Sequence, residues 1–150
     1  GLETLIGMEG SETIAYRDSA GLLTIGVGHL LAKDELSSGK LSIAGQVVKW
    51  RDGLAATQIQ DLLVQDIAPV ENAVTAAVKV PLTEDQFDAL VCFAFNVGCG
   101  AFRNSGLLRK LNTGNYAAIP AQMRRWVYAG GEVGQGLANR REKEIALWTA

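Results

Sequence analysis

The chain has 150 residues, of which 48% are hydrophobic and 20% are charged, and its formal net charge is -2. This length can bury a real core in one compact unit. No apolar run approaches the roughly 18 residues that a membrane span needs, so we expect no stable membrane association. The basic pairs lack the interleaved aromatics that a groove for single-stranded nucleic acid uses, so we expect no nucleic-acid partner.

The first predicted elements are a short helix and a hairpin. The helix covers residues 2–8, and Gly10 ends it. Two strands follow, over residues 13–17 and 22–28, around a turn of short polar residues and glycine.

Two carboxylates flank this hairpin, Glu9 at the helix end and Asp18 in the turn. Period two places Thr24 on one face with Gly26 and Gly28, and since glycine has no side chain we expect Thr24 to stand over an open floor. Glu9 follows an apolar run, where partial burial favours the protonated acid, whereas Asp18 in a polar turn stays ionised. One protonated and one ionised carboxylate in a cleft are typical of glycoside hydrolysis. The plainer alternatives are an ion pair for Glu9 and a turn-opening role for Asp18.

The middle of the chain is predicted to hold a long helix. Residues 32–53 are polar and rich in glycine, so we expect loops there with one short strand at residues 41–43. Apolar side chains then recur at helical spacing from about residue 55 to residue 78. Pro69 lies inside this stretch and lacks a backbone donor, which predicts a kink or break near Asp66.

The last third is predicted to be helical. A capping box from Thr83 to Gln86 opens a helix with apolar residues on every side, and Gly98 ends it. The further predicted elements are a helix capped by Asn104 or Ser105 and ended by Gly114, a helix capped by Asn115 that reaches about Tyr128, a loop over residues 130–136, and a final helix over residues 137–149.

The cysteines and tryptophans are interpreted as structural. Cys92 and Cys99 are predicted on one helix, roughly 10 Å apart, so they cannot pair and are expected to be free core thiols. Trp126 and Trp148 fall on apolar faces and are expected to pack in the core, whereas Trp50 is undecided.

A series of motifs runs along the chain in a specific order: Glu9-Gly10, Tyr16-Arg17-Asp18, Thr24-Ile25-Gly26, Gly28-His29-Leu30, Gln65-Asp66, Pro81-Leu82-Thr83, Phe93-Ala94-Phe95-Asn96-Val97-Gly98, Arg125-Trp126 and Arg140-Arg141. Over nearly the whole chain, this series resembles the phage lysozymes of the T-even and lambdoid type, the endolysins of glycoside hydrolase family 24. The resemblance implies a mostly α-helical α+β fold, with residues 1–150 as one lysozyme-like domain of two lobes. The small lobe, about 10–55, would hold a small three-stranded antiparallel sheet. The helical lobe, about 56–150, would be joined to it by the long helix and would carry the N-terminal helix packed on it.

The resemblance also implies the reaction and its residues. The enzyme would hydrolyse the β-1,4 bond between N-acetylmuramic acid and N-acetylglucosamine in peptidoglycan, without a metal or cofactor. Glu9 is then the general acid, and Asp18 with Thr24 holds the attacking water on the far side of the sugar ring. This implies inversion, with the two carboxyl groups about 6.5–9.5 Å apart. Arg140 matches an arginine that would orient Glu9, and burial must outweigh this arginine if Glu9 is to stay protonated.

Supporting and substrate-binding positions follow from the same resemblance. His29, the only histidine, matches a structural residue that pairs with Asp66, and this pair would raise the folded-state pKa of His29. Leu30, Phe95 and Ser105 match positions that line the saccharide cleft.

Two positions depart from the T-even pattern. Pro120 stands where a polar contact residue is expected and cannot supply its side-chain hydrogen bond, which puts one subsite in doubt. Ala20 lacks the charge that would bridge the cleft to an arginine of the opposite lobe, so the cleft is expected to open more easily.

The resemblance further implies a monomeric endolysin that accumulates in the cytoplasm of the infected host bacterium. Because Gly1 stands in place of Met, we expect a processed or trimmed start. No export signal is present in these residues, so we expect a holin to be needed before the enzyme reaches the wall.

The charge of the chain is uneven. Residues 1–99 carry 6 basic and 13 acidic side chains, whereas residues 100–150 carry 8 and 3. Two interpretations stay open: solvated helix faces, or a basic surface that helps to hold an anionic cell wall.

Two rival functions are also considered. A lytic transglycosylase would use Glu9 alone and release anhydro-sugar ends. A wall-binding module without catalysis is the other rival, and the set of Glu9, Asp18 and Thr24 argues against it.

Overall fold

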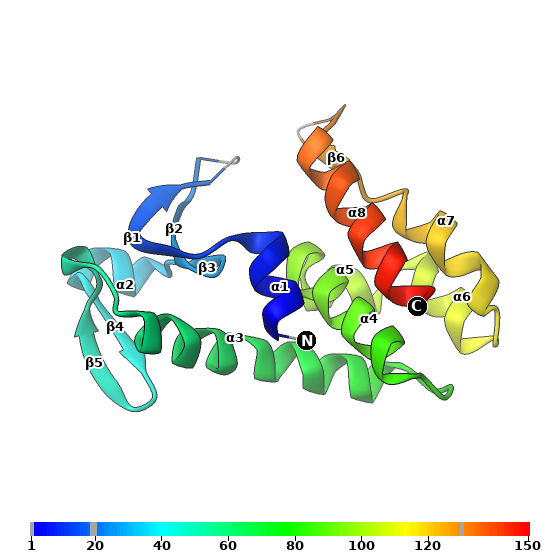
Figure 1. Ribbon diagram of the computed structural model, residues 1–150, viewed down its shortest axis with the longest axis horizontal. Helices are drawn as coiled ribbons and strands as arrows, with labels where there is room; N and C mark the ends of the chain where they lie inside the picture. Colours follow the sequence, from blue (N-terminus) through cyan, green and yellow to red (C-terminus); the bar gives the residue numbers. More distant parts are fainter. Residues whose placement is uncertain (1, 19–20, 130) are drawn as a thin grey trace. The chain divides into compact units, whose positions relative to one another are not determined.

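The computed structural model describes residues 2–18, 21–129 and 131–150 (Figure 1). The expected α+β class, mostly helical, is confirmed. The chain divides into two compact units, Gly1–Ala68 and Pro69–Ala150. The division falls inside the longest helix, α3, and the lobe boundaries expected from the sequence remain a prediction.

The first unit contains a helix, a hairpin region and the first half of the long helix. Its elements are α1 (Leu2–Glu9), β1 (Glu12–Arg17), β2 (Leu23–Gly26), β3 (His29–Leu30), α2 (Lys33–Ser38), β4 (Lys40–Ile43), β5 (Gln46–Lys49), the short 3₁₀ turn η1 (Trp50–Asp52) and α3 (Ala56–Ala77), which continues into the second unit.

The small sheet is antiparallel and three-stranded, in the order β1-β2-β3. The prediction of one strand over residues 22–28 is wrong, because the chain turns at Val27 and Gly28 and comes back as β3. Gly26 and Gly28 have φ angles of 66° and 70°, a left-handed conformation that residues with a Cβ rarely adopt. The short strand predicted at residues 41–43 is confirmed as β4, but it pairs with β5 in a separate hairpin, so the third strand of the small sheet is β3.

Thr24 and Gly26 of β2 are both buried. This corrects the expectation that Thr24 stands over an open space. Thr24 is only 4% exposed. A Cβ placed on Gly26 would lie 3.6 Å from Leu62 Cδ2 and 3.7 Å from Ile59 Cγ2, so α3 packs closely against this strand. The glycine permits close approach of a helix, one of the two outcomes that a strand glycine predicts.

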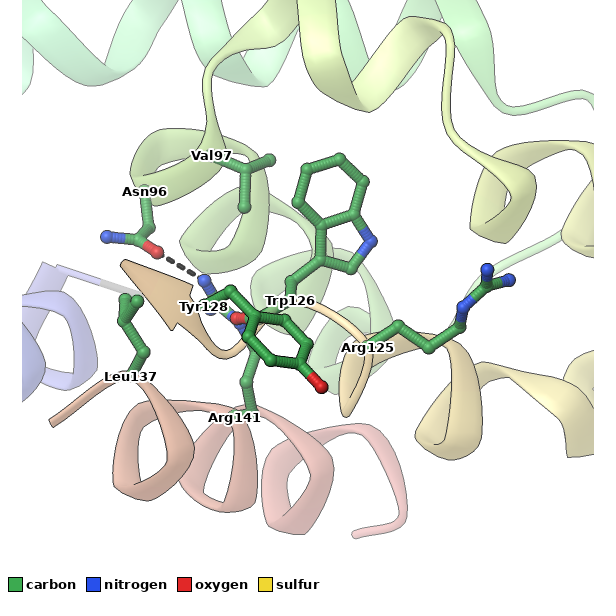
Figure 2. A pocket seen from close by; sticks show the side chains of 7 residues that line it. All are labelled: Asn96, Val97, Arg125, Trp126, Tyr128, Leu137 and Arg141. Carbon is green, nitrogen blue, oxygen red and sulfur yellow. Dashed lines mark hydrogen bonds between the residues drawn. The ribbon is translucent and has the colours of Figure 1, made fainter. Parts of the chain in front are cut away.

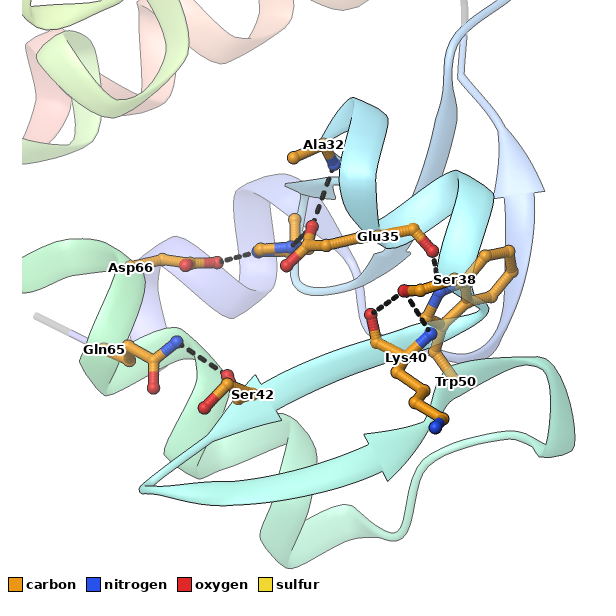
Figure 3. Close-up of polar contacts among 9 residues, drawn as sticks. Ala32, Glu35, Ser38, Lys40, Ser42, Trp50, Gln65 and Asp66 are labelled. Carbon is orange, nitrogen blue, oxygen red and sulfur yellow. Dashed lines mark hydrogen bonds and ion pairs between the residues drawn. The ribbon is translucent and has the colours of Figure 1, made fainter.

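Residues 32–53 hold more regular structure than expected. The segment contains α2, whose Glu35 accepts a hydrogen bond from the Ala32 backbone N–H at 2.8 Å, and Gly39 ends the helix at φ 70°. Trp50, undecided from sequence, is buried, and its indole N–H donates to the Glu35 carbonyl at 2.8 Å (Figure 3).

Helix α3 runs without interruption from Ala56 to Ala77 with Pro69 inside it, so the predicted break is absent. Only the proline N–H is missing, and the side chain is exposed, so the ring displaces no core residue. None of the described helices is long and apolar enough to cross a membrane.

The second unit is almost entirely helical. After α3 its elements are α4 (Glu84–Val97), α5 (Cys99–Arg103), α6 (Gly106–Asn112), the 3₁₀ turn η2 (Tyr116–Ala118), α7 (Ile119–Met123), the hairpin β6 (Tyr128–Ala129) and β7 (Glu132–Val133), and α8 (Gln135–Trp148). Helix α4 is central: its buried run covers residues 89–94, and its most extensive packing is against α8.

Two predicted helix ends in this unit are confirmed. Thr83 Oγ1 accepts from the Gln86 N–H, whose side chain in turn accepts from the Thr83 N–H. Ser105 caps α6, accepting from the Leu108 N–H at 3.1 Å. Both caps are defined by residues close in the sequence, so they can be predicted without knowing the tertiary contacts.

Two other predictions are wrong. Cys92 and Cys99 were expected on one helix, but they lie on consecutive helices because Gly98 ends α4 between them. Both thiols are free, as expected. Burial raises the pKa of the Cys92 thiol to about 11, so this thiol stays protonated. The helix expected to reach Tyr128 ends at Met123, and the following residues form β6.

Candidate active site

Glu9 is the last residue of α1. The Gly10 N–H donates to the Ile6 carbonyl at 2.8 Å, and Gly10, at φ 77°, turns the chain away from the helix towards β1. The Glu9 side chain is partly buried, as the sequence predicted. The local chain therefore holds this carboxylate at a fixed helix end beside the first strand of the sheet.

Asp18 and Thr24 are held by the same residue, Leu22. The Leu22 N–H donates to Asp18 Oδ1 at 2.9 Å, and the Thr24 hydroxyl donates to the Leu22 carbonyl at 3.2 Å. The Asp18 backbone N–H also donates to that carbonyl, at 2.9 Å. The turn thus couples the two side chains through one backbone residue.

Tyr16 is a further residue of this region. It lies on β1 directly opposite Thr24 in the sheet. Burial raises the pKa of the Tyr16 phenol, and the negative charges of Glu9, Glu12 and Asp18 raise it further. Both carboxylates singled out from the sequence are therefore close enough to the same phenol to act on it electrostatically. No role was predicted for Tyr16 from the sequence. The length of the hairpin turn was the signal that could have placed Tyr16 across from Thr24.

His29 makes the contact with Asp66 that the sequence predicted, and a second contact that it missed. Nδ1 lies 2.7 Å from Asp66 Oδ2, and Nε2 lies 3.0 Å from Glu35 Oε1; Figure 3 shows Asp66 and Glu35 in this polar cluster. Carboxylates accept and do not donate, so both ring nitrogens carry protons when both bonds form. Burial lowers the pKa of His29, but Asp66 and Glu35 outweigh burial and raise it overall.

Arg140 lies in α8, in the other compact unit, and is buried. Its Nε donates to Glu144 at 3.1 Å, and Nη2 donates to the Cys92 carbonyl at 2.8 Å. Its expected role in orienting Glu9 remains a prediction. The neighbouring Arg141 is 1% exposed and also donates to Glu144, at 2.6 Å. The spacing of three and four residues between these arginines and Glu144 was a readable signal for this cluster.

The positions expected to bind substrate have different surroundings. Leu30 is 52% exposed at the end of β3, and Phe95 is partly buried in α4. Ser105 is 4% exposed, and its hydroxyl donates to the Phe102 carbonyl at 2.7 Å while capping α6. It nevertheless lines a hollow of about 450 Å³ with Arg109 and Gln122 among its walls. Ser105 therefore combines a capping role with a place beside open space.

Of the two departures from the T-even pattern, Pro120 lies among the described residues. Pro120 lies in the first turn of α7, where a missing N–H leaves no helical bond unmade. Ala20 lies outside the described residues. Within the described part of the chain, no group of three His, Cys, Asp or Glu side chains could hold a metal ion.

These observations define a class: a lysozyme-like α+β protein with Glu9 at the end of its first helix, Asp18 in the turn of its small sheet and Thr24 on the second strand. The phage lysozyme family matches residues 7–144, and the chain belongs to that family. It is thus a glycoside hydrolase of the muramidase type, an enzyme that cleaves peptidoglycan.

Individual relatives agree with this assignment. The chain is 41% identical to the SAR-endolysin of Escherichia phage Mu, covering 97% of this chain and 77% of the relative. It is 38% identical to the endolysin of Salmonella phage P22, covering 99% and 94%. It spans 54% of the length of the endolysin of Bacillus phage PZA, to which it is 40% identical.

Solved structures give the same result. The muramidase domain of SpmX from Asticaccaulis excentricus matches with a TM-score of 0.78 at 31% identity, covering 99% of this chain and 94% of that one. A mutant of P22 lysozyme matches with a TM-score of 0.78 at 36% identity and the same two coverages.

Proposed function

We propose that this lysozyme cleaves the β-1,4 bond between N-acetylmuramic acid and N-acetylglucosamine by a single displacement with inversion. Glu9 donates a proton to the leaving oxygen, and Asp18 acts as the base towards water. The observation that carries the proposal is the local geometry: Leu22 holds both Asp18 and Thr24 at one turn of the small sheet, and Glu9 ends the helix that leads into this sheet. Two carboxylates in different surroundings are what this reaction requires.

The hydrogen bonds around Leu22 support a specific role for Thr24. Its hydroxyl gives its one hydrogen to the Leu22 carbonyl, so towards a water molecule it can only accept. Asp18, when ionised, also only accepts. A water that donates one hydrogen to Asp18 and the other to Thr24 keeps a lone pair for attack on the anomeric carbon. In the displacement, Asp18 takes a proton from this water while Glu9 gives one to the departing sugar.

The proposal also includes a biological setting. The protein acts as an endolysin on the wall of the host bacterium, after accumulating in the cytoplasm and being released with the help of a holin. It acts as a monomer, without a metal or cofactor, and Arg140 orients Glu9. Leu30, Phe95 and Ser105 contact the glycan.

The end chemistry of the products tests the assignment against a lytic transglycosylase. Pure protein is incubated with peptidoglycan, and the fragments are measured by mass spectrometry. Reducing muramic acid ends support hydrolysis, whereas anhydro ends contradict it. Glu9→Gln is expected to slow the turbidity loss of wall suspensions by about a hundred- to ten-thousandfold, because the proton donor is gone. Asp18→Asn and Thr24→Ala are expected to slow hydrolysis too, and full activity in both variants would contradict their roles.

A further inference from the structure

The hollow beside Ser105 has a positively charged wall. Its volume is about 450 Å³, and its walls come from the first turn of α6, the end of α7 and the residues that follow α7. Arg109 and Arg125 are among the described residues around it, and none of these residues is an acid. A concave wall with two guanidinium groups and no carboxylate attracts an anion.

The guanidinium of Arg109 lies on this wall. Its Nη1 donates to the Asn104 carbonyl at 3.0 Å, and its Nη2 lies 3.6 Å from the point that a Cβ on Gly106 would occupy. Asn104 and Gly106 both line the hollow. Arg109 therefore folds back over the first turn of its own helix, and its charged end lies against two residues of the wall.

Gln122 reaches the same place from α7. Its Oε1 lies 3.3 Å from the point that a Cβ on Gly106 would occupy. The Arg109 guanidinium and the Gln122 amide therefore come together over Gly106, which has no side chain to keep them apart. Two polar groups from two helices thus border the same part of the hollow.

Neither arginine of this hollow is neutralised by an acid. The described ion pairs of the second unit are made by Arg124, Arg140 and Arg141. In the part of the chain that the structure describes, no acid pairs with Arg109 or Arg125. Nor does Nη2 of Arg109 donate to another described residue. This nitrogen keeps its hydrogens for a ligand.

Arg125 adds the second positive charge. Its side chain is exposed, and Figure 2 shows it extended, with the guanidinium pointing away from Asn96 and Leu137. Those two residues line a neighbouring hollow of about 300 Å³, which Arg125 also borders. Because a charge acts over several ångströms, Arg125 strengthens the attraction for an anion without a direct contact.

We propose that this hollow binds a carboxylate of the peptidoglycan, with Arg109 as the specificity-determining donor. The inference rests on the proposed function, in which Ser105, on the same wall, contacts the glycan. An anionic group attached to that glycan then comes within reach of Arg109, and a guanidinium forms strong charge-assisted hydrogen bonds with a carboxylate. Peptidoglycan supplies carboxylates from two sources: the stem peptide, and the lactyl group of muramic acid where no peptide is attached.

Arg109→Gln tests the donor, because it removes the charge and keeps a polar side chain. Steady-state hydrolysis is measured on three soluble glycan oligomers: with stem peptides whose carboxylates are free, with the same stem peptides amidated, and without peptides. We expect KM to rise about tenfold on at least one oligomer that carries a free carboxylate, with little change in kcat. On the amidated oligomer KM should stay unchanged. Arg103→Gln is the matched control, because Arg103 is exposed and does not line this hollow.

Gln122→Glu tests the same contact with Arg109 still present. Oε1 of Gln122 already lies close to the Arg109 guanidinium, so the new carboxylate is placed to pair with it and to repel a carboxylate of the substrate. We expect KM to rise on the same oligomers as in Arg109→Gln. Gln135→Glu, at an exposed position outside the hollow, adds the same charge and should leave KM unchanged. Thermal unfolding checks that each variant is folded.

The pattern of KM identifies the carboxylate. A rise on the oligomer with free stem-peptide carboxylates indicates the stem peptide, and a rise on the peptide-free oligomer indicates the lactyl group. Unchanged KM on both of these oligomers, or an equal rise on the amidated one, would overturn the proposal. If wild-type protein hydrolyses neither the oligomers nor intact peptidoglycan, the proposed function fails instead. Calorimetric binding of the same three oligomers to wild type and Arg109→Gln then tests the hollow by the same pattern.

Discussion

At the scale of single residues, His29 is the clearest switch in the described structure. Its two ring nitrogens face Asp66 and Glu35, and these acids raise its pKa above the ordinary value of about 6.5. The folded state therefore binds a proton more tightly than the unfolded chain does. The stabilisation is complete below about pH 6.5 and is lost as pH rises through the folded-state pKa.

Asp66→Asn tests this linkage. Removing the acid lowers the folded-state pKa of His29, so the variant should lose most stability, relative to wild type, below pH 6.5. The difference should shrink as the pH rises towards 9. Urea unfolding at several pH values measures it, and Asp61→Asn, an exposed acid of the same helix, is the matched control. A difference that does not vary with pH would mean that the pair does not couple protonation to folding.

Residue-level prediction worked where the signal is local. Thr83, Gly98 and Ser105 were recognised because a cap is defined by a few neighbouring residues. The second partner of His29, Glu35, was missed because the segment around it was interpreted as a loop. The pairing of Glu144 with two arginines was missed for a different reason: a charged residue on a helix is exposed far more often than it is buried.

At the scale of elements, α3 shows how much a long amphipathic pattern tolerates. Its apolar positions predicted a helix at about residues 55–78, and the helix covers Ala56–Ala77. Pro69 did not break it, because packing along the rest of the helix outweighs one lost hydrogen bond. The local rule for proline therefore failed where tertiary contacts were extensive.

Pro69→Ala is predicted to stabilise the protein. The new N–H can donate to the Gln65 carbonyl one turn back, and the exposed ring gives up no core contact. Loss of the proline also makes the unfolded chain more flexible, which offsets part of the gain. We expect the free energy of unfolding to rise by about 1–3 kcal/mol in denaturant titrations. Asn72→Ala, at an exposed site of the same helix, should change it by less than about 0.7 kcal/mol. Equal effects of the two substitutions would contradict this explanation.

The small sheet, in contrast, could be predicted only in part. The sequence predicted its first two strands, but β3 is only His29–Leu30, which is too short for a periodic pattern. The turn before it depends on the φ angles of Gly26 and Gly28, and the close approach to Gly26 comes from Ile59 and Leu62 of α3, far along the chain. Neither feature can be derived from the strand itself.

At the scale of the whole molecule, the basic excess of residues 100–150 persists on the surface. Among the described residues from 100 onward, the exposed basic side chains are Arg103, Arg109, Lys110, Arg124, Arg125 and Lys143, and the exposed acidic ones are Glu132 and Glu142. Burial of Arg140, Arg141 and Glu144 therefore leaves a clear basic excess outside. Both interpretations of the uneven charge, a surface that holds an anionic wall and solvated faces with no binding role, are consistent with this excess.

Salt is predicted to distinguish these two interpretations. Raising the salt concentration from about 0.05 to 0.5 M shortens the Debye length from roughly 14 to 4 Å. If the basic surface holds the wall, turbidity loss of wall suspensions should slow severalfold over this range. Hydrolysis of a short uncharged chitin-type oligomer should change much less. Equal salt effects on both substrates would leave the basic side chains without a role in wall binding.

The central claim is that Glu9 and Asp18 act on opposite sides of the scissile bond with a water between them. The configuration of the first product tests it most directly, by proton NMR of a soluble oligomer recorded within the first minutes of hydrolysis. Inversion at a β-linked sugar predicts that the α-anomer appears first and then equilibrates. Initial release of the β-anomer would mean retention, and would contradict the roles given to Asp18 and Thr24.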